Sequence, residues 1–317
     1  MTQPLNIFAG ESTPARAIVD LSMLVFGITT VIFVVVAGLL IVALVKFRAT
    51  PANADREPAQ VYGSTQIELA WTIVPVLIVV VLFAATARVI HAIQDAPQPA
   101  NALAVTVIGH QFWWEYRYPA LGIVTANELH IPVSDPGRPR PTFLTLLSAD
   151  TDHSFWIPQL GGKTDLIPNR VNRLWMDPLR PGIFLGQCAQ YCGLQHAKML
   201  QRVSVDTPEE FEAWARRQQQ PAVEDESASV GRRIFETTAC INCHTVRGTV
   251  ANGRFGPDLT HLMSRATIAS GAAENTDENL HRWLKNPDAI KPGSLMPAMN
   301  ASDAELDALT RYMASLR

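Results

Sequence analysis

Two long runs without any charged residue lie in the first third of the chain, at residues 21–45 and 69–87. A helix needs about 20 apolar residues to cross the hydrocarbon core of a bilayer. Buried helices of a soluble core are the alternative, and the first run is longer than the roughly 7–15 apolar residues of a signal peptide. We predict an N-terminal tail at 1–16 and a transmembrane hairpin over 17–92, with helices at about 18–46 and 66–92.

The positive charges beside these runs predict the orientation of the hairpin. Loops with an excess of Lys and Arg stay in the cytoplasm. Arg16 precedes the first run and Arg88 follows the second, whereas the loop between them carries Lys46, Arg48 and Arg56. The sequence thus predicts a cytoplasmic loop, with both termini and everything after residue 92 on the outer face.

Short runs rich in Val, Ile, Leu and aromatic residues follow a polar linker at 93–102. Pro, Gly and Asp break them, which indicates an all-β sandwich or barrel. The predicted strands are Ala104–Ile108, Gln111–Tyr118, Thr142–Leu147, Arg170–Met176, Gly182–Gly186 and Met199–Val205. A capping box at Thr207 and Glu210 then begins a helix that runs to about Gln219. We call the predicted domain over 103–219 the β domain.

A polar, acidic linker at 220–228 separates the β domain from a part of the chain with helical periodicity. The predicted helices there are Gly231–Thr238, Asp277–Lys285 and Ser302–Leu316. They indicate a small all-α domain over 229–317, which we call the helical domain. The net charge of the whole chain is −3, so nothing in its charge indicates binding to nucleic acid.

The chain has four cysteines, and they come as two tight pairs. Cys188 and Cys192 form a C-x3-C pair, and Cys240 and Cys243 form a C-x2-C pair. A disulfide framework would need cysteines scattered along the chain. Tight pairs therefore favour metal or cofactor chemistry.

The first pair belongs to a set of soft donors. His196 and Met199 follow Cys192 within seven residues, and His153 lies upstream in an aromatic stretch. Thiolates with imidazole suit copper, and Met is a common weak axial ligand. A structural zinc site with two Cys and two His is the alternative, but it would leave Met199 unused. Two thiolates can bridge two copper ions, so the pattern favours a copper pair that transfers electrons.

The second pair lies in Cys240-Ile-Asn-Cys243-His244, the pattern of covalent c-type haem attachment. A zinc knuckle or a redox dithiol is the alternative. A methionine-bearing loop follows in the sequence, and Met–His ligation of haem iron suits electron carriage. Met296 is the preferred sixth ligand and Met299 its competitor. The sequence thus predicts a haem-binding helical domain.

Taken together, these motifs resemble subunit II of the haem–copper cytochrome c oxidases, in the bacterial caa(3)-type form with a cytochrome c domain fused at the C-terminus. The resemblance covers nearly the whole chain. It implies a cupredoxin fold for the β domain and a dinuclear CuA centre bridged by Cys188 and Cys192. The remaining copper ligands that it implies are His153, His196, Met199 and the backbone carbonyl of Gln190.

In many members of the family, a Glu at the position of Gln190 helps to hold a magnesium ion at the boundary with subunit I. A neutral amide is a poorer ligand for a hard cation. The resemblance therefore implies copper more strongly than magnesium.

The same resemblance assigns roles outside the segment Cys188–Met199, which we call the copper loop. Pro257 would accept a hydrogen bond from the axial His244 through its carbonyl. Glu68 matches the family carboxylate at the mouth of a proton channel, although its spacing alone indicates a solvated interfacial carboxylate. Electrons from cytochrome c would reach the copper through the aromatic run Phe112, Trp113 and Trp114. Many members have Trp where this chain has Phe112, so either the fused haem makes this entry route unnecessary or Trp113 substitutes for that Trp.

The implied function is transfer of electrons from cytochrome c, through the fused haem and CuA, to haem in subunit I. Oxygen reduction at haem a and CuB and proton pumping would occur in that partner, beside subunit III. The donor would be a soluble or membrane cytochrome c or an upstream complex. The implied location is the bacterial plasma membrane, with both redox domains on the periplasmic face. The alternatives are a CuA-bearing subunit of a nitric oxide reductase and a stand-alone membrane-anchored electron carrier.

Overall fold

The computed structural model describes residues 6–51, 57, 60–135, 137, 139–223 and 225–317. Arg56, on which part of the orientation argument rests, lies outside these residues. The chain divides into two compact units. One is Ala17–Pro97, and the other combines Met1–Arg16 with Gln98–Arg317.

The smaller unit contains most of α1 (Thr13–Lys46) and all of α2 (Thr65–Gln94). Both helices are long and apolar enough to cross a membrane, and none of their most apolar stretch is buried. Core helices of a soluble protein would bury that stretch. α1 begins five residues before its predicted start, because Pro14 is tolerated in the first turn of a helix, where its missing N–H is not needed.

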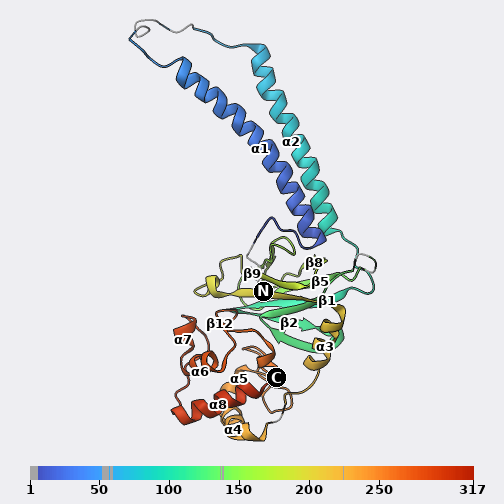
Figure 1. Cartoon of the computed structure of the whole chain (residues 1–317), viewed down its shortest axis with the longest axis vertical. Helices are drawn as coiled ribbons and strands as arrows, with labels where there is room; N and C mark the ends of the chain where they lie inside the picture. Colours follow the sequence, from blue (N-terminus) through green and yellow to red (C-terminus); the bar gives the residue numbers. More distant parts are fainter. Residues whose placement is uncertain (1–5, 52–56, 58–59, 136, 138, 224) are drawn as a thin grey trace. The chain divides into compact units, whose positions relative to one another are not determined.

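Two sheets and a hairpin form the β domain (Figure 1). The larger sheet has the strand order β3-β2-β1-β5-β8, the smaller one β4-β10-β9, and β6 pairs with β7. The strands are β1 (Leu103–His110), β2 (Trp113–Tyr118), β3 (Ile123–Ala126), β4 (Glu128–Pro132), β5 (Thr142–Ser148), β6 (His153–Phe155), β7 (Thr164–Leu166), β8 (Asn172–Met176), β9 (Gly182–Gln187) and β10 (Leu200–Asp206). β1–β5 and β4–β10 are parallel, and the other neighbouring pairs are antiparallel.

The core of the β domain reaches the predicted copper ligands. Val105 and Val107 of β1 lie opposite Leu144 and Leu146 of β5 and are buried. Alternate residues of a strand point to the same face, so these valines line one side of the sheet. Cys188, Cys192 and Met199 belong to the same buried cluster. The donors are therefore part of the packed interior.

α3 (Pro208–Gln218) ends the β domain and begins with the predicted capping box, in which Thr207 and Glu210 bond each other's backbone N–H. Its Trp214 is buried against the rings of Tyr118 and His130. Trp214 therefore packs α3 onto the β domain.

The helical domain is small and built from short elements (orange to red in Figure 1). Its helices are α4 (Ser229–Thr237), α5 (Cys240–Cys243), α6 (Asp277–Lys285), α7 (Pro287–Ile290) and α8 (Asp303–Ser315), with a two-stranded ribbon of β11 (Thr267–Ile268) and β12 (Ala273–Glu274). Single 3-10 turns occur in the chain at η1 (Pro119–Leu121), η2 (His196–Lys198), η3 (Glu226–Ala228) and η4 (Leu262–Ser264). α4 crosses α8 so closely that a Cβ on Gly231 would lie 2.0 Å from the carbonyl oxygen of Ala308.

Candidate functional site

The loop between β9 and β10 gathers sulfur and imidazole donors at one end of the β domain. Cys188 follows β9 directly, Met199 precedes β10, and His153 is the first residue of β6. His153 and Met199 are 0% exposed, and Cys188 and Cys192 are 2% and 3% exposed. Packing in the interior of the β domain thus holds these side chains.

The donors fall into two halves that share the cysteines. In the first half, the Sγ of Cys188 lies 3.9 Å from Nδ1 of His153 and 3.2 Å from the carbonyl oxygen of Gln190. The side chain of Gln190 is exposed, so only its backbone faces the site.

In the second half, the Sγ of Cys192 lies 3.7 Å from Nδ1 of His196 and 3.9 Å from Sδ of Met199. The two Sγ atoms are 3.8 Å apart, and both cysteines are free thiols. Each sulfur therefore has its own histidine and a further donor. Such a set fits two soft metal ions that share two thiolates better than one tetrahedral zinc.

Asp150 and Gly109 orient His153. Oδ1 of Asp150 lies 2.8 Å from Nε2 of the ring, which leaves Nδ1 directed at Cys188. A Cβ on Gly109 would lie 2.8 Å from the imidazole, so the strand can approach the ring only with glycine there. Burial alone would lower the pKa of His153, but the hydrogen bond to Asp150 and the contact with Cys188 raise it.

The two thiols do not ionise alike. The hydrogen bond with Cys192 lowers the pKa of Cys188 to about 3, against the opposing effect of burial, and His153 adds to the lowering. The same contact and burial raise the pKa of Cys192. A thiolate is the form that binds metal, and the contacts around Cys188 favour that form.

The haem-attachment motif occupies α5 and the residue after it. Nδ1 of His244 lies 2.8 Å from the carbonyl oxygen of Pro257, so that carbonyl fixes the ring and leaves Nε2 for another partner. A Cβ on Gly256 would lie 2.5 Å from the ring. Burial lowers the pKa of His244, which favours the neutral imidazole that ligates iron.

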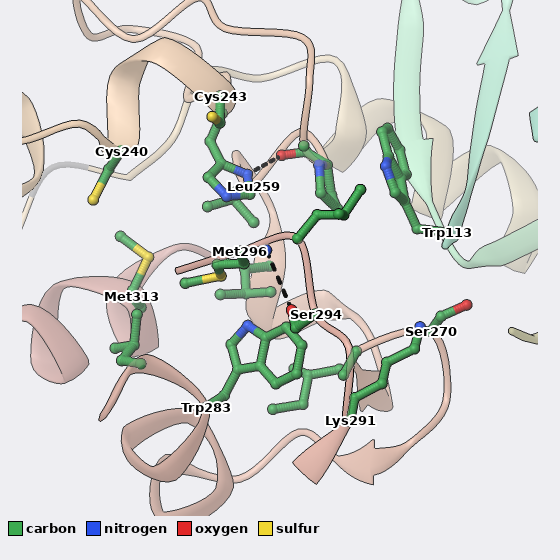
Figure 2. A pocket seen from close by; sticks show the side chains of 18 of the residues that line it. Trp113, Cys240, Cys243, Leu259, Ser270, Trp283, Lys291, Ser294, Met296 and Met313 are labelled. Atoms are coloured by element: carbon green, nitrogen blue, oxygen red, sulfur yellow. Dashed lines mark hydrogen bonds between the residues drawn. The ribbon is translucent and has the colours of Figure 1, made fainter. Parts of the chain in front are cut away.

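An apolar cavity lies beside this motif (Figure 2). The thioether sulfurs of Met296 and Met313 and the ring of Trp283 face it together with Cys240 and Cys243. Met299 also lines the cavity, so both predicted candidates for the sixth ligand remain near it. The remaining apolar side chains that line it include Phe235, Leu259, Leu262, Ile268, Leu280, Leu284 and Leu309. A flat apolar ring with two attachment points fits this lining.

One wall of the cavity comes from the β domain. Gln111, Phe112, Trp113, Asn127 and Gln195 line it together with the helical domain's residues. Nε2 of Gln111 donates to the carbonyl oxygen of Cys192 at 2.6 Å. The segment that walls the cavity therefore also contacts the copper loop.

The structure separates the members of the predicted aromatic run. Phe112 and Trp113 line the cavity, whereas Trp114 is 0% exposed in the core of the β domain, with its ring 5.9 Å from that of His153. Glu68 lies in the first turn of α2 and belongs to the other compact unit.

Several residues of the site carry no signal in the sequence. Trp283 packs on the helical core and also faces the cavity. Arg265 and Lys291 are buried there, and burial lowers the pKa of both, for Lys291 to about 7. Buried cations are rare, so nothing in the local pattern marks them in advance.

Family models match three parts of the chain. The model for cytochrome c oxidase subunit II, transmembrane domain, matches residues 2–88, and the one for its periplasmic domain matches 137–205. The model for cytochrome c matches 228–317. The three matches follow the hairpin, the β domain and the helical domain in order.

Curated relatives match most of the chain. A cytochrome c oxidase subunit 2 of Alkalihalophilus pseudofirmus is 34% identical over 96% of this chain and 88% of its own. A quinol oxidase subunit 2 of Bacillus cereus is 30% identical over 69% of this chain and 74% of its own. The solved periplasmic domain of subunit II of cytochrome oxidase from Bradyrhizobium japonicum is 28% identical, covers 38% of this chain and 96% of its own, and has a TM-score of 0.36.

Proposed function

The chain belongs to the family of cytochrome c oxidase subunit II, and on that premise we propose that it carries electrons from a cytochrome c-type donor to subunit I of a haem–copper terminal oxidase. It contributes to the respiratory chain as a membrane-anchored oxidase subunit with its own cytochrome c domain. In this proposal electrons pass through a covalent haem c and a dinuclear copper centre of this chain, and onward to haem in subunit I.

One observation carries the proposal: the copper donors and the haem cavity lie in one compact unit and share the segment Gln111–Trp113. Phe112 and Trp113 line the cavity, and Gln111 bonds the backbone of Cys192. A short protein path between two redox groups is what single-electron transfer requires. The shared segment therefore supports electron transfer between the two sites, which neither site alone would indicate.

The residues of each site have defined tasks. When bound, the copper pair and the haem each accept and release one electron with little change in geometry. Cys188 and Cys192 would bridge the copper ions, with His153, His196, Met199 and the Gln190 carbonyl completing the set. Cys240 and Cys243 would hold the porphyrin by thioethers, with His244 and Met296 on the iron. The exposed amide of Gln190 gives no support for magnesium.

Oxygen chemistry and proton pumping are assigned to the partner subunits. Among the described residues, His153 with Cys188 and Cys192 is the one group of His, Cys, Asp or Glu side chains close enough to hold a metal ion. An oxygen-reducing site with its own haem and CuB would need further ligands. We assign these to subunit I, with subunit III beside it, and place the redox domains on the periplasmic face of the plasma membrane.

Three alternatives make different demands. A nitric oxide reductase subunit would share the copper site, but the match of Glu68 to a proton-channel carboxylate favours oxygen. A quinol donor would need no haem domain, whereas the CxxCH motif and its cavity favour a one-electron donor. A stand-alone carrier would purify without a haem-bearing subunit of many helices.

Metal analysis and EPR of the purified full-length chain test the proposal. We expect two copper ions and one haem per chain, and an EPR signal from one unpaired electron shared by both coppers. A protein that contains zinc in place of copper, or no covalent haem, would refute the proposed electron path.

Glu68 tests the proposed link to proton uptake. In the oxidase complex, replacing Glu68 by Ala should slow proton uptake and oxygen turnover severalfold, while the spectra of copper and haem stay unchanged. Glu57 lies in the described part of the loop before α2 and provides a matched control as Glu57→Ala. Normal turnover of the Glu68 variant in proteoliposomes would return this residue to a solvated interfacial role.

A further inference from the structure

A buried lysine joins the helical domain to the segment that walls the haem cavity. Lys291 is the first residue of the loop over 291–299, which carries Met296 and Met299 and which we call the methionine loop. The residue is 3% exposed. Its Nζ donates to the carbonyl oxygen of Phe112 in the β domain at 2.7 Å. Figure 2 shows Lys291 below the cavity, in the same ribbon as Ser294 and Met296.

The copper loop also forms hydrogen bonds with the backbone of Lys291 and Pro292. Nε2 of Gln195 donates to the carbonyl oxygens of Lys291 and Pro292, at 3.0 Å each. Gln195 lies between the predicted copper ligands Cys192 and His196 and is itself buried. Residues 291–292 are therefore hydrogen-bonded both to Phe112 at the wall of the cavity and to Gln195 of the copper loop.

The segment Gln111–Trp113, which lines the cavity, is also hydrogen-bonded to the copper loop. Gln111 donates to the carbonyl oxygen of Cys192 at 2.6 Å. A Cβ on Gly193 would lie 3.0 Å from the ring of Phe112, so the copper loop approaches that ring at a glycine with φ of +127°. Lys291, Phe112 and Cys192 thus belong to one continuous set of contacts.

Stability alone gives a poor account of this lysine. Burying an amine costs free energy unless the interactions it gains offset the loss of hydration. An apolar residue of similar length would fill the same space without that cost. The position of Lys291, between the loop of the sixth haem ligand and the carbonyl of Phe112, suggests a role in the relative placement of the two redox sites.

We propose that Lys291 is a positioning residue that fixes the methionine loop of the haem site against the copper loop, so that electron transfer occurs within one preformed contact. The inference rests on the proposed function. In the step concerned, one electron leaves ferrous haem iron, which becomes ferric, and reduces the mixed-valence copper pair. No bond forms or breaks and no proton moves. The rival is a tethered helical domain that must find the copper site in each turnover.

A second inter-domain contact provides a comparison. The carboxylate of Glu128 in β4 accepts from the N–H groups of Ala266 and Thr267 at 2.9 Å each, and from the hydroxyl of Thr267 at 2.7 Å. None of these three residues is a predicted ligand of the copper centre or of the haem iron. Glu128 thus joins the domains without contacting the copper loop or the methionine loop.

The experiment measures internal electron transfer in the full-length chain loaded with copper and haem. An electron is injected into the haem by a light-driven reductant, and the absorbance of both centres follows its passage to copper. The variants are Lys291→Met and Glu128→Gln, which removes the charge at the second inter-domain contact. The matched control on the helical domain is Lys285→Met, because the side chain of Lys285 is 58% exposed and its amine pairs with Asp303. Reduction potentials and copper EPR are recorded for each.

Loss of one partner of a buried hydrogen bond commonly shifts an equilibrium by about tenfold or more. We therefore expect Lys291→Met to slow haem-to-copper transfer about tenfold, with unchanged potentials and copper EPR, while Lys285→Met transfers at the normal rate. If Lys291→Met does not fold, Gln195→Met, which removes the donor to residues 291 and 292, should slow transfer likewise.

The outcomes separate this inference from the proposed function. Normal transfer in both interface variants, or slow transfer that follows a shifted potential or a lost copper signal, overturns the positioning role. Equal slowing by Glu128→Gln and Lys291→Met also overturns it, because any inter-domain contact would then serve. No transfer in the unaltered protein would instead refute the proposed function itself.

Discussion

In the β domain the predicted metal donors are part of the packed core, whereas in the helical domain the predicted haem ligands lie at the edge of the core, beside an apolar cavity. Cys188, Cys192 and Met199 are buried among the strands' apolar side chains. Cys240 and Met296 are only partly buried at the edge of a smaller cluster. The β framework thus places its ligands in advance, while the helical domain has an apolar lining that a porphyrin would bury. Metal affinity should depend on ligand placement in one domain, and stability on the cofactor in the other.

The sharpest test of the preformed site removes a shared ligand. Cys192→Ser should abolish the mixed-valence copper EPR signal, because the proposed copper pair depends on both sulfurs as bridges. The β domain should still fold, since its core contains many other side chains, and circular dichroism checks this. An unchanged EPR signal would contradict the assignment of Cys192 as a bridge.

Removing the haem attachment tests the opposite design. The double change Cys240→Ala and Cys243→Ala should lower the melting temperature of the helical domain by roughly 15 °C or more, because a tightly bound partner adds several kcal/mol to a domain of this size. Copper content and the β-domain transition should not change. Calorimetry resolves the two transitions, and equal melting with and without haem would show that the cavity is not a stabilising site.

The orientation of His153 allows a graded test of preorganisation. Asp150→Asn weakens the acceptor that fixes Nε2 of the ring, so copper affinity should fall about 10–100-fold. Asp152→Asn, two residues along and exposed, is the control. Competition with a copper chelator measures both affinities. Equal affinities would mean that the strands alone hold the ring.

The smallest expected effect distinguishes the two methionines at the cavity. Met296→Leu should lower the haem reduction potential, because loss of a thioether ligand destabilises the ferrous state, and Met299→Leu should leave it nearly unchanged. Redox titration of the haem absorbance measures both. A shift in the Met299 variant instead would transfer the axial role to that residue.

Local chemistry explains which elements could be predicted from the sequence. The helices that begin with capping boxes, α3 and α8, start where Thr207 and Ser302 predict, because a cap depends on residues three positions apart. The strands β3, β4, β6 and β7 were not predicted. They are three to five residues long, and their burial comes from neighbouring strands rather than from their own pattern.

The same limit applies to the site. The copper donors lie mostly on one loop, so their spacing alone predicted a set that the structure brings together. The wall of the cavity was not predictable in this way, because Gln195 and Lys291 meet across two domains. The aromatic run was predicted as one group, yet the alternation of β2 sends Trp114 into the core and leaves Trp113 at the cavity.

The shared wall of the haem cavity has a consequence for how such proteins can be recombined. By sequence the helical domain resembles an independent module, with its own haem-attachment motif and its own helices. Yet Gln111, Phe112 and Trp113 enclose one side of its cofactor cavity. A chimera that joins the helical domain to the copper domain of another protein would keep the proposed haem-attachment motif but lose this side of the cavity, so a haem bound there would be more exposed to water. A functional chimera should therefore include the connection between β1 and β2, Gln111 and Phe112, together with the helical domain.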